Sequence, residues 1–254
     1  MKISQSLAGN SLASTYQNAK PFPHIVLRDF WDSDSLKAVS DEVKGFDFFE
    51  GEKDFYGAKK KRYCGTYDKL PPLARDLIDS CHSFEFLKFL EEMTGQSDLV
   101  SDPYLLGGGI HSITTDGYLK VHADFNWHKQ LQLYRRINLL IYLNPGWNPN
   151  WGGELELWTQ DMKRKEVSVE PQLNTMVVFT TDDSSFHGHP DALKCPEGVT
   201  RDSIALYYYS PARTDDEKRR LRDTTDYRAR GLMDREVAVK SAKEKISSLF
   251  NAAR

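Results

Sequence analysis

The sequence predicts a mainly β protein with flanking helices, in which the strands fold into a jelly roll. Short β-rich runs separated by turn signals follow one another over residues 104–210, without a helical pattern between them. Such a succession is typical of a sandwich or barrel. Before it, residues 32–95 carry apolar side chains at helical spacing, and we expect these helices to brace the outside of the sheet.

The ends of the helical region carry recognisable signals. Residues 32–34 (Asp-Ser-Asp) offer an N-cap before one apolar stripe, and the proline pair at 71–72 begins a second helical pattern that ends at Gly95. Residues 21–27 read as a short extended strand. We expect residues 1–20 to be flexible, because they are polar and rich in serine.

The core should be a double-stranded β-helix of the cupin-like kind. We expect its strands at 108–114, 118–125, 137–143, 154–158, 167–169, 175–180 and 203–209. We assign residues 21–211 to one domain, and the charged residues 212–254 to a helical extension with a helix at 234–250. Acids and bases alternate in this extension, as they do on a solvated helical surface.

Composition narrows the choice of partner and compartment. A net charge of −3 gives no general reason to expect nucleic acid or an anionic membrane as partner. Cys64, Cys81 and Cys195 are an odd number, widely spaced, so neither a disulfide framework nor a thiolate zinc site is predicted. No stretch approaches the ~20 apolar residues of a membrane helix. We expect a cytoplasmic protein with no membrane partner and no direct binding of nucleic acid.

The pattern His122-Ala123-Asp124 places an imidazole and a carboxylate on one face of a predicted strand. Alone, this pattern is most often two surface or turn residues. Here a histidine also follows the apolar strand at 175–180, and two histidines with one carboxylate can hold Fe(II) on one face while leaving other positions free. Both His187 and His189 fit as the third ligand, and the residues alone leave that choice open.

An arginine and a serine then begin the last predicted strand. A guanidinium can bind a carboxylate through two parallel charge-assisted hydrogen bonds, and a nearby hydroxyl can add a third. Alternation places Arg201 and Ser203 on one strand face, and Asn138 and Tyr142 on one face of another strand, so the two pairs could meet across a pocket. The dicarboxylate that suits iron chemistry is 2-oxoglutarate.

Three short segments resemble the prolyl-hydroxylase branch of the 2-oxoglutarate and Fe(II)-dependent oxygenases: Ile-Tyr-Leu-Asn at 141–144, Gly-Gly-Glu-Leu at 152–155 and Ser-Phe-His at 185–187. Most of the chain is similar to the catalytic domain of ribosomal-protein prolyl 3-hydroxylases, from the Pro-Phe-Pro-His at 21–24 to the core at 117–210. The resemblance implies that the third iron ligand is His187.

The resemblance also implies roles in a cofactor site. Arg201 should bind the distal carboxylate of 2-oxoglutarate together with the hydroxyl of Tyr142, and His111 falls where relatives have a polar aromatic side chain in the pocket. Ser203 and Asn138 complete the expected cofactor contacts. The implied cofactors are Fe(II) and 2-oxoglutarate, with O₂ as co-substrate, and ascorbate (vitamin C) could serve as reductant.

A loop at 125–128 should form the rim of the pocket, where loops often select the substrate. We expect Phe125, Trp127 and Tyr118 at this rim. Trp127 could stack on a prolyl or sugar ring, or pack against its own loop. The basic run Lys59–Arg62 could recruit an acidic or nucleic-acid-bound substrate. Such runs are more often a solvated strand or loop. In relatives, this region covers the pocket as a lid.

These expectations describe a dioxygenase that hydroxylates an unactivated C–H bond, with a prolyl residue of a protein as the first choice. One alternative is a small-molecule substrate: a free amino acid, a sugar or a natural-product intermediate. Another is a jelly roll without oxygenase activity that holds a different metal, such as zinc, with the same three ligands. In that case Arg201 and Ser203 would have no assigned task.

Overall fold

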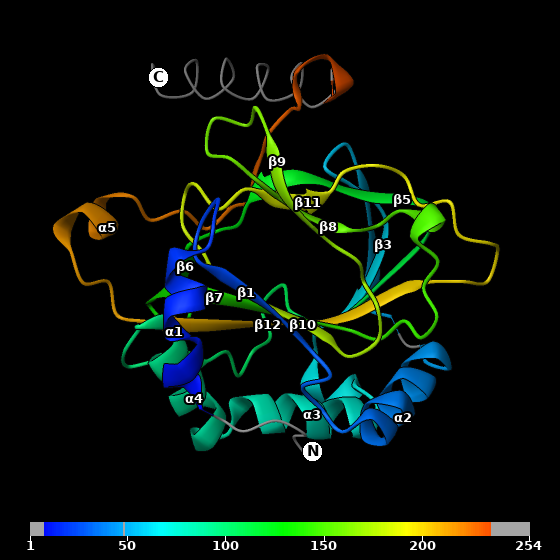
Figure 1. Cartoon of the computed structure of the whole chain (residues 1–254), viewed down its shortest axis with the longest axis horizontal. Coiled ribbons are helices and arrows are strands. Elements are labelled where there is room, and N and C mark those ends of the chain that lie inside the picture. Colours follow the sequence, from blue (N-terminus) through cyan, green and yellow to red (C-terminus); the bar gives the residue numbers. More distant parts are fainter. Residues whose placement is uncertain (1–7, 48, 235–254) are drawn as a thin grey trace.

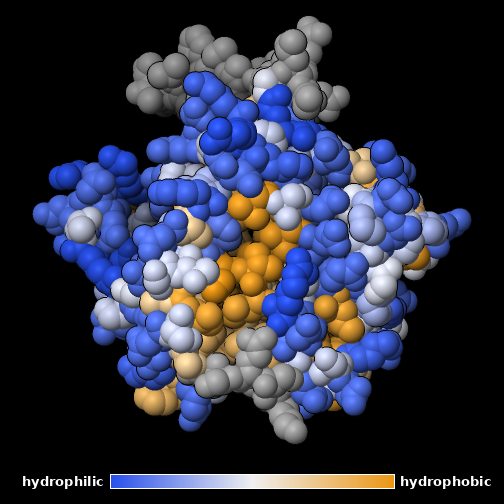
Figure 2. Space-filling model, viewed as in Figure 1, coloured by the Kyte–Doolittle hydropathy of each residue, from blue (hydrophilic) through white to orange (hydrophobic). Residues whose placement is uncertain are grey.

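The strands join into one mostly antiparallel sheet that curls into a nearly closed barrel (Figure 1). The computed structural model describes residues 8–47 and 49–234. The main path of the sheet runs β1-β10-β7-β12-β5-β11-β8-β9, so within the described residues β1 and β9 are its two ends. Apolar side chains reach the surface near the middle of the face viewed in Figure 2. The predicted fold class, a jelly roll with flanking helices, is confirmed.

The elements have the following bounds. The helices are α1 (Gly9–Asn18), α2 (Ser33–Lys44), α3 (Pro72–His82), α4 (Phe84–Thr94) and α5 (Asp215–Arg219), with short 3₁₀ turns at Tyr67–Lys69, Pro149–Trp151 and Gly231–Asp234. The strands are β1 (His24–Arg28), β2 (Gly51–Phe55), β3 (Ala58–Cys64), β4 (Val100–Ser101), β5 (Gly109–Ala123), β6 (Trp127–His128), β7 (Leu133–Tyr142), β8 (Leu155–Trp158), β9 (Lys165–Val169), β10 (Thr175–Thr180), β11 (His187–His189), β12 (Arg201–Ser210) and β13 (Asp226–Tyr227).

The helices α2, α3 and α4 lie along one side of the sheet, and their apolar faces join its core (Figure 1). The N-cap predicted for α2 is present, because the Asp32 carboxylate accepts a hydrogen bond from the Ser35 amide at 3.0 Å. Gly95 ends α4 with φ of 72°, a left-handed conformation that glycine adopts without strain.

The prediction of a flexible segment at 1–20 is wrong for Gly9–Asn18, which forms α1. Gly9 lies so close to α4 that an added Cβ would come within 2.4 Å of the Phe89 carbonyl oxygen. Tyr16 is fully buried, and its hydroxyl is 2.9 Å from that of Thr180 on β10. A single tyrosine on one helical face was too weak a signal among polar neighbours to predict this docking.

The region 32–95 is not entirely helical, because β2 and β3 form a hairpin within it. The strand β3 pairs with β5, and the register shifts between Lys59 and Lys61. Lys60 forms this bulge with φ of 50°, and its ammonium reaches outward to Asp116. The basic run therefore does not form one solvated patch, since Lys61 faces the inside of the barrel and is 9% exposed.

The two strands predicted at 108–114 and 118–125 are one long strand, β5. The turn signal at Asp116-Gly117 produces a local irregularity instead, in which Asp116 has φ of 63° and its amide donates to the Leu193 carbonyl at 2.9 Å. β5 continues through this point because β3 pairs with it on both sides.

The C-terminal extension is described as far as residue 234, and the predicted helix at 234–250 otherwise lies outside the described residues. No helix in the described part of the chain has the length and apolar character needed to cross a membrane. Cys64, Cys81 and Cys195 are buried free thiols. The predicted domain boundaries stay predictions.

Replacing Tyr16 by Ala should lower the free energy of unfolding by about 3–5 kcal/mol, because a large buried aromatic side chain would leave a cavity between α1 and the sheet. Urea denaturation measures this. The exposed neighbour Thr15→Ala serves as the control and should change stability by less than about 0.5 kcal/mol. An equally small effect of Tyr16→Ala would show that α1 does not stabilise the barrel.

Candidate metal centre and cofactor pocket

Three buried side chains, His122, Asp124 and His187, each offer one ligand atom, and these atoms lie within 4.8 Å of one another. His122 on β5 is directly opposite His187 on β11 in an antiparallel pair. Directly opposed residues point to the same face of a sheet, so the two imidazoles meet inside the barrel. Asp124 follows two residues after His122, on the same side.

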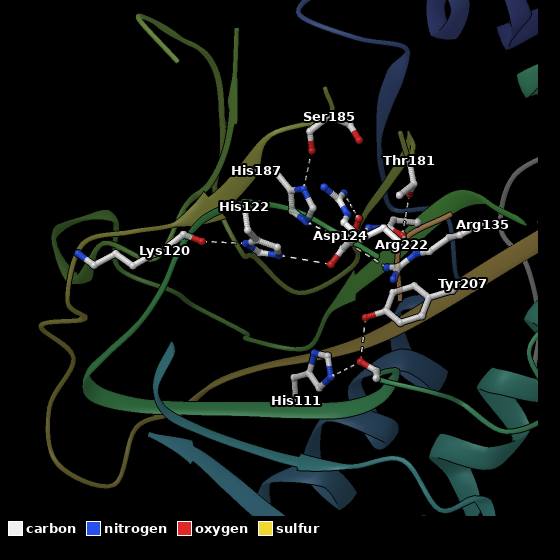
Figure 3. Close-up of polar contacts among 12 residues, drawn as sticks. His111, Lys120, His122, Asp124, Arg135, Thr181, Ser185, His187, Tyr207 and Arg222 are labelled. Atoms are coloured by element: carbon white, nitrogen blue, oxygen red, sulfur yellow. Dashed lines mark hydrogen bonds and ion pairs between the residues drawn. The ribbon is translucent and has the colours of Figure 1, made fainter. Parts of the chain in front are cut away.

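Each histidine of this group is fixed by the backbone carbonyl two residues before it (Figure 3). The Nδ1 atom of His122 is 2.8 Å from the Lys120 carbonyl oxygen, and the Nδ1 atom of His187 is 3.0 Å from that of Ser185. A carbonyl only accepts hydrogen bonds, so the proton is on Nδ1 and the Nε2 lone pair is free for a metal. Burial lowers the pKa of His187 to about 4, which keeps this imidazole neutral at pH 7.

The carboxylate of Asp124 is held by two donors on β7. Its Oδ2 atom accepts hydrogen bonds from Arg135 Nη2 at 2.9 Å and Asn138 Nδ2 at 2.7 Å. Burial alone would raise the pKa of Asp124, but the Arg135 guanidinium holds it well below its usual range. The ionised carboxylate thus keeps Oδ1 for a cation, and the group has the donor set that suits Fe(II).

The structure distinguishes His187 from His189, the other candidate for the third ligand. His189 is buried on the same strand and lines the same cavity, but it does not belong to the group of three. Both of its ring nitrogens are buried without a hydrogen-bond partner within the described residues. The geometry therefore favours His187 as the third ligand.

A cavity of about 70 Å³, here called the inner cavity, opens beside the three ligands. All of the residues predicted to bind the cofactor line this cavity. These are His111, Asn138, Tyr142, Arg201 and Ser203. They come together because Ser203 on β12 pairs with Tyr142 on one side and with His111 on the other.

Arg201 is 4% exposed and has no acidic partner in the described residues. Its Nε atom donates to the Gly153 carbonyl at 2.6 Å, and its Nη2 atom donates to the Tyr142 hydroxyl at 3.2 Å. Gly153 has φ of 82°, and an added Cβ would lie 3.0 Å from the Arg201 side chain. A buried guanidinium needs an anion, so this arrangement fits the far carboxylate of 2-oxoglutarate.

Two of the predicted cofactor residues contact other groups of the protein. The Asn138 amide, besides holding Asp124, accepts hydrogen bonds from Arg135 at 2.7 Å and Thr181 at 2.9 Å. His111 Nε2 lies 3.1 Å from the Gly107 carbonyl, which also accepts from the Tyr207 hydroxyl (Figure 3). Asn138 thus positions a metal ligand, and its predicted contact with the cofactor stays a prediction.

The predicted rim residues do not line the inner cavity. Trp127 lies half-buried in β6, so the predicted loop at 125–128 is partly a strand. Tyr118 lies in β5 opposite Lys59, with the Lys120 ammonium 4.5 Å from its ring centre. Phe125 lines a second cavity further out, and its ring also covers the Arg135 guanidinium at 4.6 Å.

Arg135, Lys61 and Tyr227 were missed by the sequence analysis. The pairing of β7 with β12 shifts register at Arg136, which turns Arg135 to the same face as Asn138. The bulge at Lys60 does the same for Lys61. Strict alternation of side chains does not predict either register shift. Nothing in the sequence indicates that an arginine or lysine within a charged run is buried.

The chain after β12 returns over the metal ligands. β13 pairs with β5, and the Tyr227 ring lies 5.3 Å from that of His122. The Arg222 guanidinium donates to the Asp124 carbonyl at 2.7 Å, and the Arg222 carbonyl accepts from the Asn126 amide at 2.9 Å. This part of the predicted charged extension therefore contributes to the site.

The choice between the two histidines can be tested with anaerobic Fe(II) and 2-oxoglutarate. The wild-type protein should develop the weak visible charge-transfer absorption of a keto acid chelated to iron, His187→Ala should lose it, and His189→Ala should keep it. Loss in His189→Ala with retention in His187→Ala would reverse the assignment.

Arg135→Met should weaken iron binding about 10–100-fold, because Asp124 loses the donor that orients and ionises it. Metal titration followed by the same absorption measures the affinity. Arg136→Met is the matched control, since this neighbouring guanidinium is also buried but pairs with Glu217 on the other face. Equal iron affinities for both variants would contradict a role for Arg135.

Comparison with known proteins extends this picture. Prolyl 3-hydroxylase OGFOD1 from Mus musculus is 28% identical over 199 residues, which cover 76% of this chain and 34% of that protein. The chain thus spans about a third of the length of this relative. A prolyl hydroxylase from Trichoplax adhaerens, solved with a peptide fragment of the hypoxia inducible factor oxygen degradation domain, has a TM-score of 0.55 at 16% identity, covering 79% of this chain and 88% of that one.

HygX from Streptomyces hygroscopicus, solved with nickel, 2-oxoglutarate and hygromycin B, has a TM-score of 0.50 at 13% identity and covers 82% of this chain and 93% of that one. At these identities the solved structures show the fold alone. The sequence model of the 2OG-Fe(II) oxygenase superfamily matches residues 108–209, the segment that carries all three metal ligands and Arg201. This part of the chain therefore matches the 2OG-Fe(II) oxygenase superfamily, and the match includes the three candidate metal ligands and Arg201.

Proposed function

We propose that the protein is an Fe(II)- and 2-oxoglutarate-dependent dioxygenase that hydroxylates a prolyl residue of a protein. The observation that carries the oxygenase part is the meeting, in one cavity, of the three metal ligands with a buried arginine that has no acidic partner among the described residues. A jelly roll that only binds zinc would have no use for a buried arginine beside its metal ligands.

In the proposed reaction, 2-oxoglutarate, O₂ and a substrate C–H bond become succinate, CO₂ and an alcohol. Fe(II), when bound, supplies this oxidative chemistry. The protein supplies binding and orientation. Arg201 and the Tyr142 hydroxyl hold the far carboxylate of 2-oxoglutarate, and Arg135 with Asn138 keeps Asp124 ionised and oriented. The ligands are nearly excluded from solvent, which protects the reacting centre from water.

Support for a prolyl substrate comes from the relatives. The mouse protein is named as a prolyl 3-hydroxylase, and the Trichoplax enzyme was solved with a peptide fragment. A second cavity of about 470 Å³, here called the outer groove, adjoins the inner cavity and gives room for such a chain. We also propose a cytoplasmic location, because three reduced thiols and Fe(II) suit a reducing compartment.

The substrate can be tested by incubating the protein with Fe(II), 2-oxoglutarate and ascorbate. One set of reactions receives proline-containing proteins and peptides, including ribosomal proteins, and the other receives amino acids, sugars and aminoglycosides. We expect succinate and a gain of one oxygen on a prolyl residue. Oxygen gained only by small molecules would contradict the prolyl substrate, and no succinate under any condition would contradict the oxygenase.

Arg201→Met should raise the KM for 2-oxoglutarate about 10–100-fold, since a charge-assisted pair to the far carboxylate is lost. Succinate formation at varied 2-oxoglutarate measures the KM. The affinity for Fe(II) alone should stay unchanged, because Arg201 is not a ligand. A variant with the wild-type KM would show that the guanidinium does not bind the cofactor.

A further inference from the structure

The outer groove lies between the β2–β3 hairpin and the loop 104–108, and it shares two lining residues with the inner cavity. These are Lys61 and His111. Both are buried, and the place where they line the two cavities is here called the passage between the outer groove and the inner cavity. The side chains of this passage can therefore influence which substrate binds.

Lys61 stands in one row with the arginine of the cofactor site. Lys61 on β3 is opposite Ile113 on β5, and Ile113 is opposite Arg201 on β12, so all three side chains share the inner face. Two strand spacings separate the backbones of Lys61 and Arg201 by about 10 Å. The barrel thus presents two positive groups to one interior space.

The ammonium of Lys61 makes no hydrogen bond or ion pair with any described residue, and Lys61 is 9% exposed. A buried cation without a partner is costly and is rarely retained without a binding role. Burial, together with nearby Lys53, lowers the pKa of Lys61 to about 7. The Asp124 carboxylate acts on this pKa in the opposite direction, but it is already paired with Arg135.

The other charges of the site are accounted for. Asp124 is paired with Arg135, and 2-oxoglutarate would neutralise Arg201 and part of the metal charge. In the outer groove, the Glu50 carboxylate pairs with Lys69 and accepts hydrogen bonds from the amides of Gly65 and Thr66.

Asp223, the other acid of the outer groove, is paired with Lys129. Lys53, by contrast, has no ion pair with any described residue, and its ammonium lies 5.8 Å from the centre of the Tyr63 ring. The charge left over in the passage and the groove is therefore positive.

We propose that Lys61 recognises a carboxylate of the substrate, carried by an aspartate or glutamate beside the hydroxylated proline. This inference rests on the proposed function. One residue of extended chain spans about 3.3–3.6 Å. A proline at the metal centre therefore leaves its immediate neighbour at the passage, where the Lys61 ammonium lies, and Lys53 adds positive potential further out along the groove.

The test uses the full chain loaded with Mn(II) and 2-oxoglutarate, and three labelled peptides that differ only in the residue next to proline: Glu, Gln or Lys. We expect the Glu peptide to bind wild type about tenfold more tightly than the Gln peptide, and the Lys peptide to bind most weakly. Lys61→Met should abolish the preference for Glu over Gln without changing the Kd for 2-oxoglutarate.

Two further variants serve as controls. Lys61→Arg keeps the charge and should keep the preference for Glu, which separates a lost cation from a damaged fold. Lys60→Met removes the neighbouring lysine, which points outward to Asp116, and should behave as wild type. Loss of the preference in Lys60→Met would assign it to the general charge of the strand and overturn the inference.

The remaining outcomes are distinguishable. Peptides that bind and are hydroxylated without a preference for Glu would overturn the role of Lys61 and leave the proposed function standing. A weaker Kd for 2-oxoglutarate in Lys61→Met, with the peptide preference intact, would assign Lys61 to the cofactor instead. No binding by any peptide would overturn the prolyl substrate, and the inference with it.

Discussion

The antiparallel pairing of β5 with β11 is the constraint on which the site depends. It sets His122 directly opposite His187, and the backbone carbonyls of Lys120 and Ser185 turn the two imidazoles toward one point. Asp124 reaches that point from the end of β5. Because sheet register fixes the two histidines, and Arg135 and Asn138 hold Asp124, the metal site should be largely formed before the cofactors bind.

The rest of the barrel is arranged around β5. This strand pairs with β3, β11, β12 and β13, so it connects the hairpin that bears Lys61, the candidate metal ligand His187, the buried Arg201 and the returning C-terminal segment. A change in the register of β5 would move every one of these groups. The segment beyond β12 adds to this arrangement, because Arg222 and β13 contact the end of β5.

The jelly roll and the metal ligands could be predicted because their signals are local: alternating strands, turn residues and the spacing of His122 and Asp124. The choice of His187 over His189 needed either a resemblance or coordinates, since both lie on one strand. Arg135 and Lys61 could not be predicted, because register shifts at Arg136 and Lys60 break the alternation that sequence reasoning assumes.

The most direct test is a crystal structure of the protein with Mn(II) and 2-oxoglutarate, with the metal located by anomalous scattering. The account predicts one metal ion bound by the Nε2 atoms of His122 and His187 and by the carboxylate of Asp124, with the far carboxylate of 2-oxoglutarate on Arg201. A metal bound through His189, or a cofactor whose far carboxylate does not contact Arg201, would contradict it.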